Sequence, residues 1–269
     1  MRKVPYSGVQ TKVQRLLGAD TLLTSEQNAI LNAVNKYCRA AWERHPWPEI
    51  CATQQRAVNG RVNSVSITSS GASYTSAPTV AFSSGGATAT ASINDNVVNS
   101  ILLTNGGSNY ATAPTVSFSG GAGTGAAATA NLTFTVDYDG ADPFIGDFFT
   151  MYKNDPTKTA YPEELPFQLN ADGARVQNKN DSTPVFVHFR KRFKDYTTTS
   201  TDLPYVFEQY LVHGAFADMM LGDGQHDKSN NALGRAEQLI LSELDNLERQ
   251  QGQQIHTRIL SHGNQQNRI

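Results

Sequence analysis

The sequence predicts an α+β fold in which a helical core is interrupted by an inserted all-β domain. Apolar residues recur at helical spacing near both ends of the 269-residue chain. Residues 59–135 are almost free of charged side chains and rich in Ser, Thr, Ala, Gly and Val. The same stretch contains two copies of a repeat of about 36 residues, a pattern typical of short strands separated by turns. We therefore expect a long N-terminal helix, C-terminal helices and a few strands around a β insertion.

Charge and composition exclude several classes of protein. With 22 Lys and Arg against 24 Asp and Glu, the formal charge is −2, so a generally basic, DNA-coating surface is not expected. No apolar run approaches the roughly 20 residues of a membrane-spanning helix, and no secretory signal is recognisable, so we expect a soluble protein without a membrane partner. The two cysteines, Cys38 and Cys51, are expected to be ordinary thiols.

The N-terminal helix is predicted to start at Thr24, because Thr24 and Gln27 have the spacing of a capping box. Pro46 and Pro48 forbid its continuation. A shorter helix over residues 9–17 is expected to precede it. The apolar stripe of the longer helix consists of Ile30, Leu31, Val34, Tyr37, Cys38, Ala41 and Trp42.

The repeat is visible as "GASYTSAPTVAF", from residue 71, and "GSNYATAPTVSF", from residue 107. Each copy is expected to form three short strands, which in the first copy cover residues 62–68, 77–82 and 87–93. A disordered Gly/Ser-rich linker is the alternative interpretation. Against it, both copies keep one tyrosine, one proline and one phenylalanine at fixed offsets, which a linker does not require.

The composition becomes ordinary again after the repeats. "PFIGDFFTMYKND" fits a strand or a helix, and "TPVFVHFRKRF" alternates like a strand. The predicted organisation is a discontinuous core of residues 1–58 and 136–250, a β-repeat domain of residues 59–135 and an extended tail of residues 251–269. The two C-terminal helices are predicted from the stripes Phe207, Tyr210, Leu211 and Ala215, and Leu233, Ala236, Ile240, Leu244 and Leu247.

Two residue clusters contain the residue types that bind metals. His226 lies between Asp223 and Asp227, but no further ligand at suitable spacing completes a site, which favours a solvated loop. "DYDGAD", residues 137–142, lacks the later Glu of a calcium loop and is interpreted as a turn at a domain boundary.

Catalytic motifs are also missing. The sequence contains no G-x-S-x-G, no Walker-type phosphate loop and no H-E-x-x-H. Glu163 and Glu164 are adjacent, so their side chains diverge and make a poor acid/base pair. We therefore predict a protein that is not an enzyme and that has no cofactor and no metal.

A basic cluster, "FRKRFKD", contains Arg190, Lys191 and Arg192 at the end of the predicted strand. One interpretation is a charged strand edge that blocks unwanted pairing. The other is an electrostatic contact to a partner surface or to a phosphate backbone.

Several of these elements together resemble the head-to-tail connector proteins of tailed bacteriophages. They are the helix ending in "AAWERHPWPEI", the stretch "FFTMYKNDP", the strand "PVFVHFRKRF" and the helix "LPYVFEQYLVHGAFADMML". The family is that of the adaptor, or head completion, protein of the neck. The repeat is similar to modules found in phage structural proteins, so both resemblances point to a virion.

The resemblance implies a homo-oligomeric ring, usually of twelve copies, docked beneath the portal protein and followed by a tail or nozzle protein. It places the protein in the virion neck after assembly in the host bacterial cytoplasm, with DNA passing through without specific binding. It also implies a C-terminal tail that orders on the portal, with Ile255, Ile259 and Leu260 as anchors. The repeats are expected to project outward as a decoration or docking surface.

Three other functions compete with this one. In a tail-fibre-associated or glycan-binding protein, Tyr74 and Tyr110 would be exposed and would stack on sugar rings. A tail terminator or stopper ring is the closest rival among structural proteins. A carboxylate-based hydrolase is the enzymatic alternative.

Overall fold

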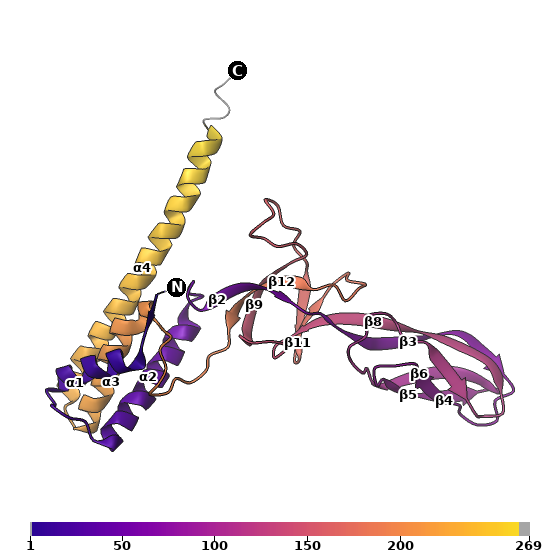
Figure 1. Cartoon of the computed structure of the whole chain (residues 1–269). Helices are drawn as coiled ribbons and strands as arrows, with labels where there is room; N and C mark the ends of the chain where they lie inside the picture. The colour runs from indigo at the N-terminus through magenta and orange to yellow at the C-terminus, as the bar shows by residue number, and fades with distance from the viewer. Residues whose placement is uncertain (1, 264–269) are drawn as a thin grey trace. The chain divides into compact units, whose positions relative to one another are not determined.

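The computed structural model describes residues 2–263, and side chains up to residue 250 (Figure 1). The chain divides into two compact units: a helical unit, up to Ile50 and from Phe193 on, and a β unit, Cys51–Arg192. The β unit is larger than the expected repeat domain of residues 59–135. The reason is that strands on both sides of the repeats pair with one another, or with the outer strands of the repeats themselves.

The expected fold class, a helical core with a few strands, is wrong. The described residues form thirteen strands in four antiparallel sheets and four α-helices, with 35% of residues in strands against 31% in helices, so the protein is mostly β. The chain also does not open on a long helix. Strand β1 (Lys3–Val4) and the 12-residue helix α1 (Tyr6–Leu17) come first, and α1 ends at Gly18, whose φ of 69° is left-handed.

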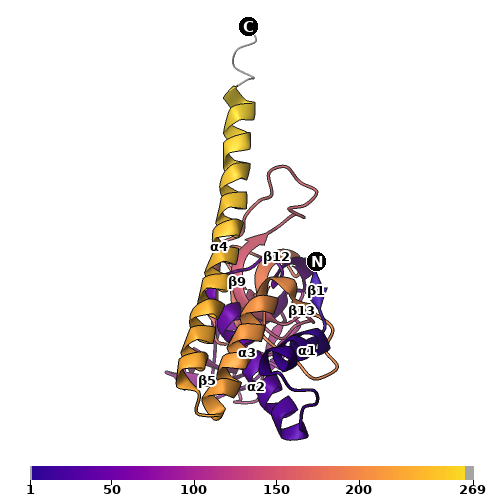
Figure 2. The same ribbon diagram turned by 90° about the vertical axis from the view of Figure 1, so that its left-hand side faces the viewer.

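The helical unit contains every α-helix of the described residues. Helix α3 (Glu208–Gly222) packs against α1, α2 and α4, as Figure 2 shows. Strand β13 pairs with β1, and the short 3₁₀ helix η1 leads into α3. The remaining elements are α2 (Thr24–Arg44), β13 (Leu203–Pro204), η1 (Tyr205–Phe207) and α4 (His226–Gly263).

Helix α2 begins at the expected residue but with a different cap. The Leu23 backbone N–H donates to Glu26 Oε2 at 2.7 Å, so the carboxylate of Glu26 satisfies the free donor, whereas the predicted partner Gln27 donates to the Leu22 carbonyl instead. Six of the seven residues of the predicted stripe, Ile30, Val34, Tyr37, Cys38, Ala41 and Trp42, are buried, whereas Leu31 is half-buried.

In the β unit, two sheets share one hydrophobic core. One has the order β2-β12-β9 and the other β10-β11-β8-β3. The predicted strand over residues 185–191 is confirmed as β12 (Val185–Lys191), and the ambiguous aromatic stretch forms β9 (Ile145–Tyr152). The shared core consists of Val58, Phe134, Val136, Ile145, Phe148, Met151, Ala174, Val176, Val185, Val187 and Phe189.

The two repeats form six strands, β3 to β8, three from each copy. The first strand of each copy pairs with the third strand of the other copy, as β3 with β8 and β6 with β5, and the two second strands, β4 and β7, pair together. The bounds of the strands of this repeat module and of its neighbours are β2 (Cys51–Arg56), β3 (Asn59–Ala72), β4 (Thr79–Phe82), β5 (Thr88–Asn94), β6 (Val97–Asn105), β7 (Val116–Ser119), β8 (Thr124–Asp137), β10 (Phe167–Asn170) and β11 (Gly173–Val176).

The register shows that the module has an internal twofold relation. Val80 pairs with Phe118, and Phe82 pairs with Val116. A shift of 36 residues relates Val80 to Val116 and Phe82 to Phe118, so exchanging the two copies maps each pair onto the other. The irregularities in β3, where Asn63 and Thr68 are skipped in the ladder, recur at the equivalent residues of β6.

Backbone hydrogen bonds follow the same relation. The Tyr74 N–H donates to the Asn96 carbonyl at 2.9 Å, and the Tyr110 N–H donates to the Gly60 carbonyl at 3.1 Å. Each copy thus hydrogen-bonds to the start of the other copy. The two copies are therefore interlocked rather than stacked side by side.

Each repeat tyrosine lies under a glycine turn of the other copy. Gly85, with φ of 75°, lies so close to Tyr110 that a Cβ atom there would overlap the ring. Gly121, the equivalent residue, has φ of 72° and faces Tyr74. Both turns need glycine for two reasons, the left-handed backbone and the tight approach of the ring.

Gly85→Ala and Gly86→Ala separate these two reasons. Both residues have a left-handed φ, but the space beside Gly86 is open. We expect Gly86→Ala to lower the free energy of unfolding by about 1 kcal/mol, through backbone strain alone. Gly85→Ala should cost about 2 kcal/mol more, because the buried Tyr110 ring must move. Equal losses, measured by urea unfolding followed by circular dichroism, would contradict the packing described for Tyr110.

Candidate functional site

The β10-β11-β8-β3 sheet has one apolar face and one polar face. Its apolar face contributes Phe134, Val136 and Val176 to the shared core. Because side chains alternate along a strand, the neighbouring residues point to the opposite face. By the register of the four strands, this polar face carries Asn59, Arg61, Thr133, Thr135, Asp137, Gln168, Asn170 and Arg175.

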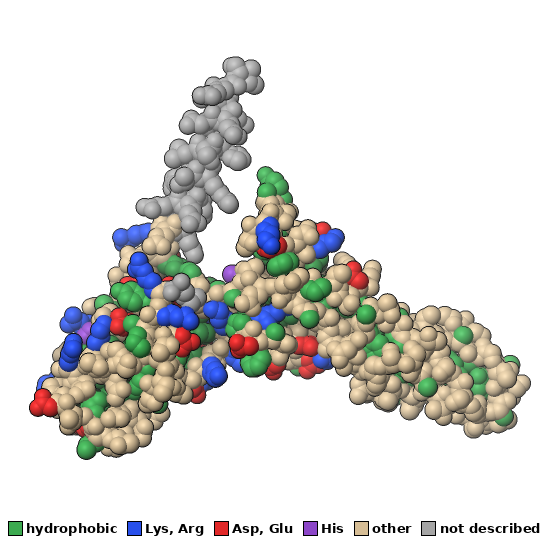
Figure 3. Space-filling view, viewed as in Figure 1, with side chains coloured by type: hydrophobic (Ala, Val, Ile, Leu, Met, Phe, Trp, Pro, Cys, Tyr) green, Lys and Arg blue, Asp and Glu red, His purple; other side chains and the backbone are tan. Residues whose placement is uncertain are grey.

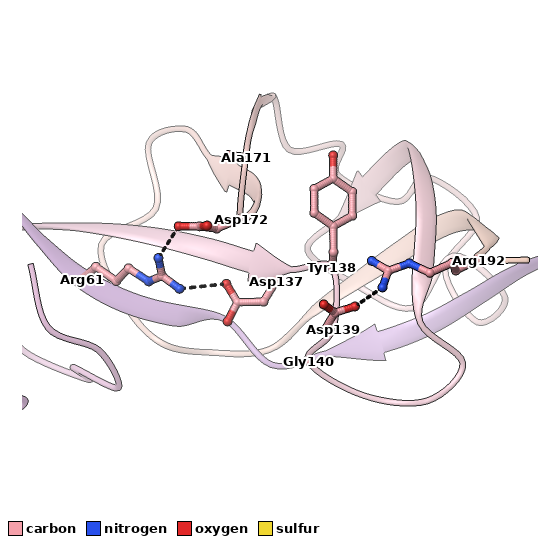
Figure 4. A pocket seen from close by; sticks show the side chains of 8 residues that line it. All are labelled: Arg61, Asp137, Tyr138, Asp139, Gly140, Ala171, Asp172 and Arg192. Carbon is pink, nitrogen blue, oxygen red and sulfur yellow. Dashed lines mark hydrogen bonds and ion pairs between the residues drawn. The ribbon is translucent and has the colours of Figure 1, made fainter. Parts of the chain in front are cut away.

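A hollow of about 540 Å³ lies beside this face, where β3 and β8 meet the turn between β10 and β11 (Figure 4). In this hollow, one terminal nitrogen of Arg61 donates to Asp172 Oδ2 at 2.7 Å. The other terminal nitrogen of Arg61 lies 3.5 Å from Asp137 Oδ1. Arg192 lies 2.5 Å from Asp139 Oδ1. The Tyr138 side chain points away from these ion pairs (Figure 4). The hollow therefore contains carboxylates and guanidinium groups in alternation.

Two polar atoms on the floor of this hollow have no hydrogen bond to the described residues. Arg61 Nε and Asp137 Oδ1 are both covered from solvent. The other oxygen of Asp137 accepts from Asn59 Nδ2 at 3.0 Å. Arg61 and Asp137 thus each keep one covered polar atom whose hydrogen-bonding capacity is not used within the described residues.

The predicted basic cluster lies at the end of β12, and its two arginines are ion-paired within the β unit. Arg190 Nε donates to Asp147 Oδ2 at 2.6 Å, and Arg192 pairs with Asp139. Lys191 also has an interaction partner. The cluster joins β12 to β9 and to the turn after β8. Sequence reasoning could not find these pairs, because the partners lie more than 40 residues earlier in the chain.

The expectation that Tyr74 and Tyr110 are exposed surface residues is wrong. Their residues are 2% and 3% exposed. The Tyr110 hydroxyl donates to the Ser84 carbonyl at 2.5 Å and accepts from the Ala87 N–H at 3.1 Å. Both rings are core residues of the repeat module and are not available to stack on sugars.

The remaining candidates are spread over the chain. Glu163 pairs with Lys153 at 3.1 Å, and His226 is the first residue of α4. No group of three metal-ligating side chains is found among the described residues. None of the described helices is both long and apolar enough to span a bilayer. The predicted anchors Ile255, Ile259 and Leu260 have side chains outside the described part of the chain.

Tyr110→Phe tests the buried hydroxyl, with Tyr74→Phe as the matched control from the equivalent position. Removal of the Tyr110 hydroxyl leaves the Ala87 N–H without an acceptor, which costs about 1–3 kcal/mol of unfolding free energy. No hydrogen bond is formed by the Tyr74 hydroxyl within the described residues, so Tyr74→Phe should cost less than about 0.5 kcal/mol. Chemical denaturation of both variants measures the difference, and similar losses would contradict the assignment.

Thiol alkylation tests the environment of the two cysteines. Burial raises the pKa of the Cys38 thiol to about 12, so at pH 8 it is almost entirely protonated and unreactive. Cys51 is only partly buried. Iodoacetamide at pH 8 should modify Cys51 in the native protein and Cys38 only after unfolding, as measured by peptide mass spectrometry. Rapid native modification of Cys38 would contradict its burial.

Comparison with known proteins identifies no relative: no protein-family model and no curated protein matches this chain. The function is therefore inferred from the residues of the chain and their geometry.

Proposed function

We propose that the protein is a structural virion protein, a ring-forming head-to-tail adaptor that docks under the portal and joins the capsid to the tail. The observation that supports this proposal is helix α4, which is much longer than the helix on which it packs. The resemblance of the chain to phage connector proteins supplies the class of assembly.

Helix α4 has 38 residues, whereas its neighbour α3 has 15. At 1.5 Å per residue these lengths correspond to about 57 Å and about 22 Å. The buried face of α4 begins at Ser229 and continues through Ala232 and Ala236 to Ile240, which is 1% exposed. Beyond Ile240, α4 continues to Gly263 (Figure 1). The segment expected to be an extended tail is thus helical up to this residue, since it contains no proline and many residues of high helix propensity.

The apolar stripe of α4 continues past the last fully buried residue. Leu244 and Leu247 follow Ile240 at spacings of four and three residues and are only half-buried, and Leu241 is 51% exposed. A single helix that is not packed against anything is marginal in water, and helical stability in proteins comes mostly from packing of an apolar face. The second half of α4 is therefore suited to pack against another helix, from a neighbouring copy or from the portal.

The repeat module fits a role in assembly rather than in chemistry. Between residues 62 and 134 the only charged side chain is Asp95. The face of the module that is visible in Figure 3 accordingly shows hardly any acidic or basic side chains. Contacts made through such a surface depend little on salt. The overall charge of −2 also suits a channel through which DNA passes without being held.

Native mass spectrometry of the full-length chain, alone and mixed with portal protein, tests the proposal, together with electron-microscope class averages. We expect a ring, either free or formed on the portal, with twelve copies as the expected number. A chain that stays monomeric in the presence of assembled portals would overturn the adaptor function. A ring that binds only tail components would indicate a terminator or stopper instead.

The double variant Leu244→Lys/Leu247→Lys places two charges on the apolar stripe of α4. We expect ring formation to fall at least tenfold, while circular dichroism and the melting temperature of the monomer stay close to those of the wild type, because these leucines are only half-buried in the single chain. Ser242→Lys, on the opposite side of the same helix turns, is the matched control and should assemble normally. Normal assembly of the double variant would exclude this stripe as the interface.

A further inference from the structure

Three hollows follow the polar face of the β10-β11-β8-β3 sheet and share lining residues. The hollow at β10 and β11, of about 390 Å³, shares Thr133 with a central hollow of about 220 Å³. The central hollow shares Arg61 and Asp172 with the 540 Å³ hollow of Figure 4. We call these three neighbouring hollows the polar groove.

We propose that the polar groove binds an extended oligosaccharide that carries an acidic group. The site is distinct from the α4 stripe and does not depend on the proposed adaptor function. It also differs from a site on the repeat tyrosines, which are buried.

The first argument is the chemistry of the lining. Each carboxamide group presents both donors and acceptors, as sugar hydroxyls do, so the two can pair at every position along a chain of sugars. Thr133 and Thr135 add hydroxyl groups at the centre. The groove has seven carboxamide side chains, which are Asn63, Asn105, Gln168, Asn170, Gln177, Asn178 and Asn180.

The second argument is the balance of charge, which disfavours a nucleic acid. The lining contains four cationic and three anionic side chains, and Arg61, Lys179 and Arg192 are each paired with a carboxylate. The negative charges of Asp137 and Asp172 would repel a phosphate backbone. Such a backbone requires unpaired cations, and most cations of the groove are already paired.

The third argument disfavours a peptide. Protein partners are held mainly by apolar and aromatic side chains that fill pockets. Val62 and Val176 are each 3% exposed and belong to the hydrophobic cores, and Leu132 and Tyr138 are partly buried and packed against a core, so the apolar lining offers no such pocket. A ligand bound by hydrogen bonds alone, such as a saccharide, fits the groove better.

Arg175 accounts for the acidic group. It lies on β11 within the lining of the 390 Å³ hollow, is half-buried, and makes no ion pair with the described residues. No carboxylate lines this hollow. A guanidinium group binds a carboxylate through two parallel hydrogen bonds, so Arg175 would hold a uronic-type carboxylate. At the other end, the exposed Asp172 carboxylate would accept hydrogen bonds from sugar hydroxyls.

The test begins with the full-length protein on an array of acidic and neutral oligosaccharides of four to eight sugars. We expect binding to at least one uronic acid-containing chain and little binding to the neutral chains. The affinity for the strongest acidic probe is then measured by isothermal titration calorimetry. Silence across the whole array, with the fold intact by circular dichroism, would overturn the proposal, as would binding to neutral chains alone.

Variants locate the site. Arg175→Gln should weaken binding of the acidic probe at least tenfold, since a charge-assisted pair is lost, and Gln168→Ala should weaken it about threefold to tenfold. Arg15→Gln, which changes an exposed arginine of α1, is the matched control and should bind like the wild type. Both groove positions are on the solvent side of the sheet, so the fold should be kept. Binding that survives both groove substitutions would place the site elsewhere and overturn the assignment.

Discussion

The β unit depends on one antiparallel ladder, that between β3 and β8. The ladder runs from the Asn59–Thr135 pair to the Ala72–Thr124 pair. At one end it belongs to the sheet whose two faces are the shared core and the polar groove. At the other end it closes the repeat module. Because strands in one ladder alternate their side chains together, the register that buries Phe134 also sets Arg61 and Thr133 on the polar face.

The sequence predicts the strands of the repeats well, because β-branched residues and turn formers alternate at the same offsets in both copies. It does not predict how the strands pair. Two copies that fold separately and two copies that exchange partners have the same periodicity, and only the fold distinguishes them. The burial of Tyr74 and Tyr110 follows from this exchange, since each ring is covered by glycines that lie in the other copy. The only sequence signal was the pair of equivalent glycines, Gly85 and Gly121.

The fold class was mispredicted for a different reason. Residues 136–192 form short strands, such as β10 and β11 with four residues each, whose patterns are too brief to distinguish from loops. The polar groove could not be predicted either. Its lining comes from residues between Arg61 and Arg192, and in the sequence each of them is only the polar member of an alternating strand or a residue of a polar turn. The ion pairs of Arg190 and Arg192 could not be predicted either, because they are set by strand register and not by local sequence.

The interlocked repeats also constrain how this chain can change during evolution. A single copy would lose the long ladders of its first and third strands, because β3 pairs with β8 and β6 with β5 across the two copies. An insertion in one copy alone would break the match between Val80–Phe118 and Phe82–Val116. Each copy therefore depends on the other for its longest ladders, and a substitution in β4 or β7 is made against the strand of the other copy. Duplication in this chain did not add a second domain; it completed the first.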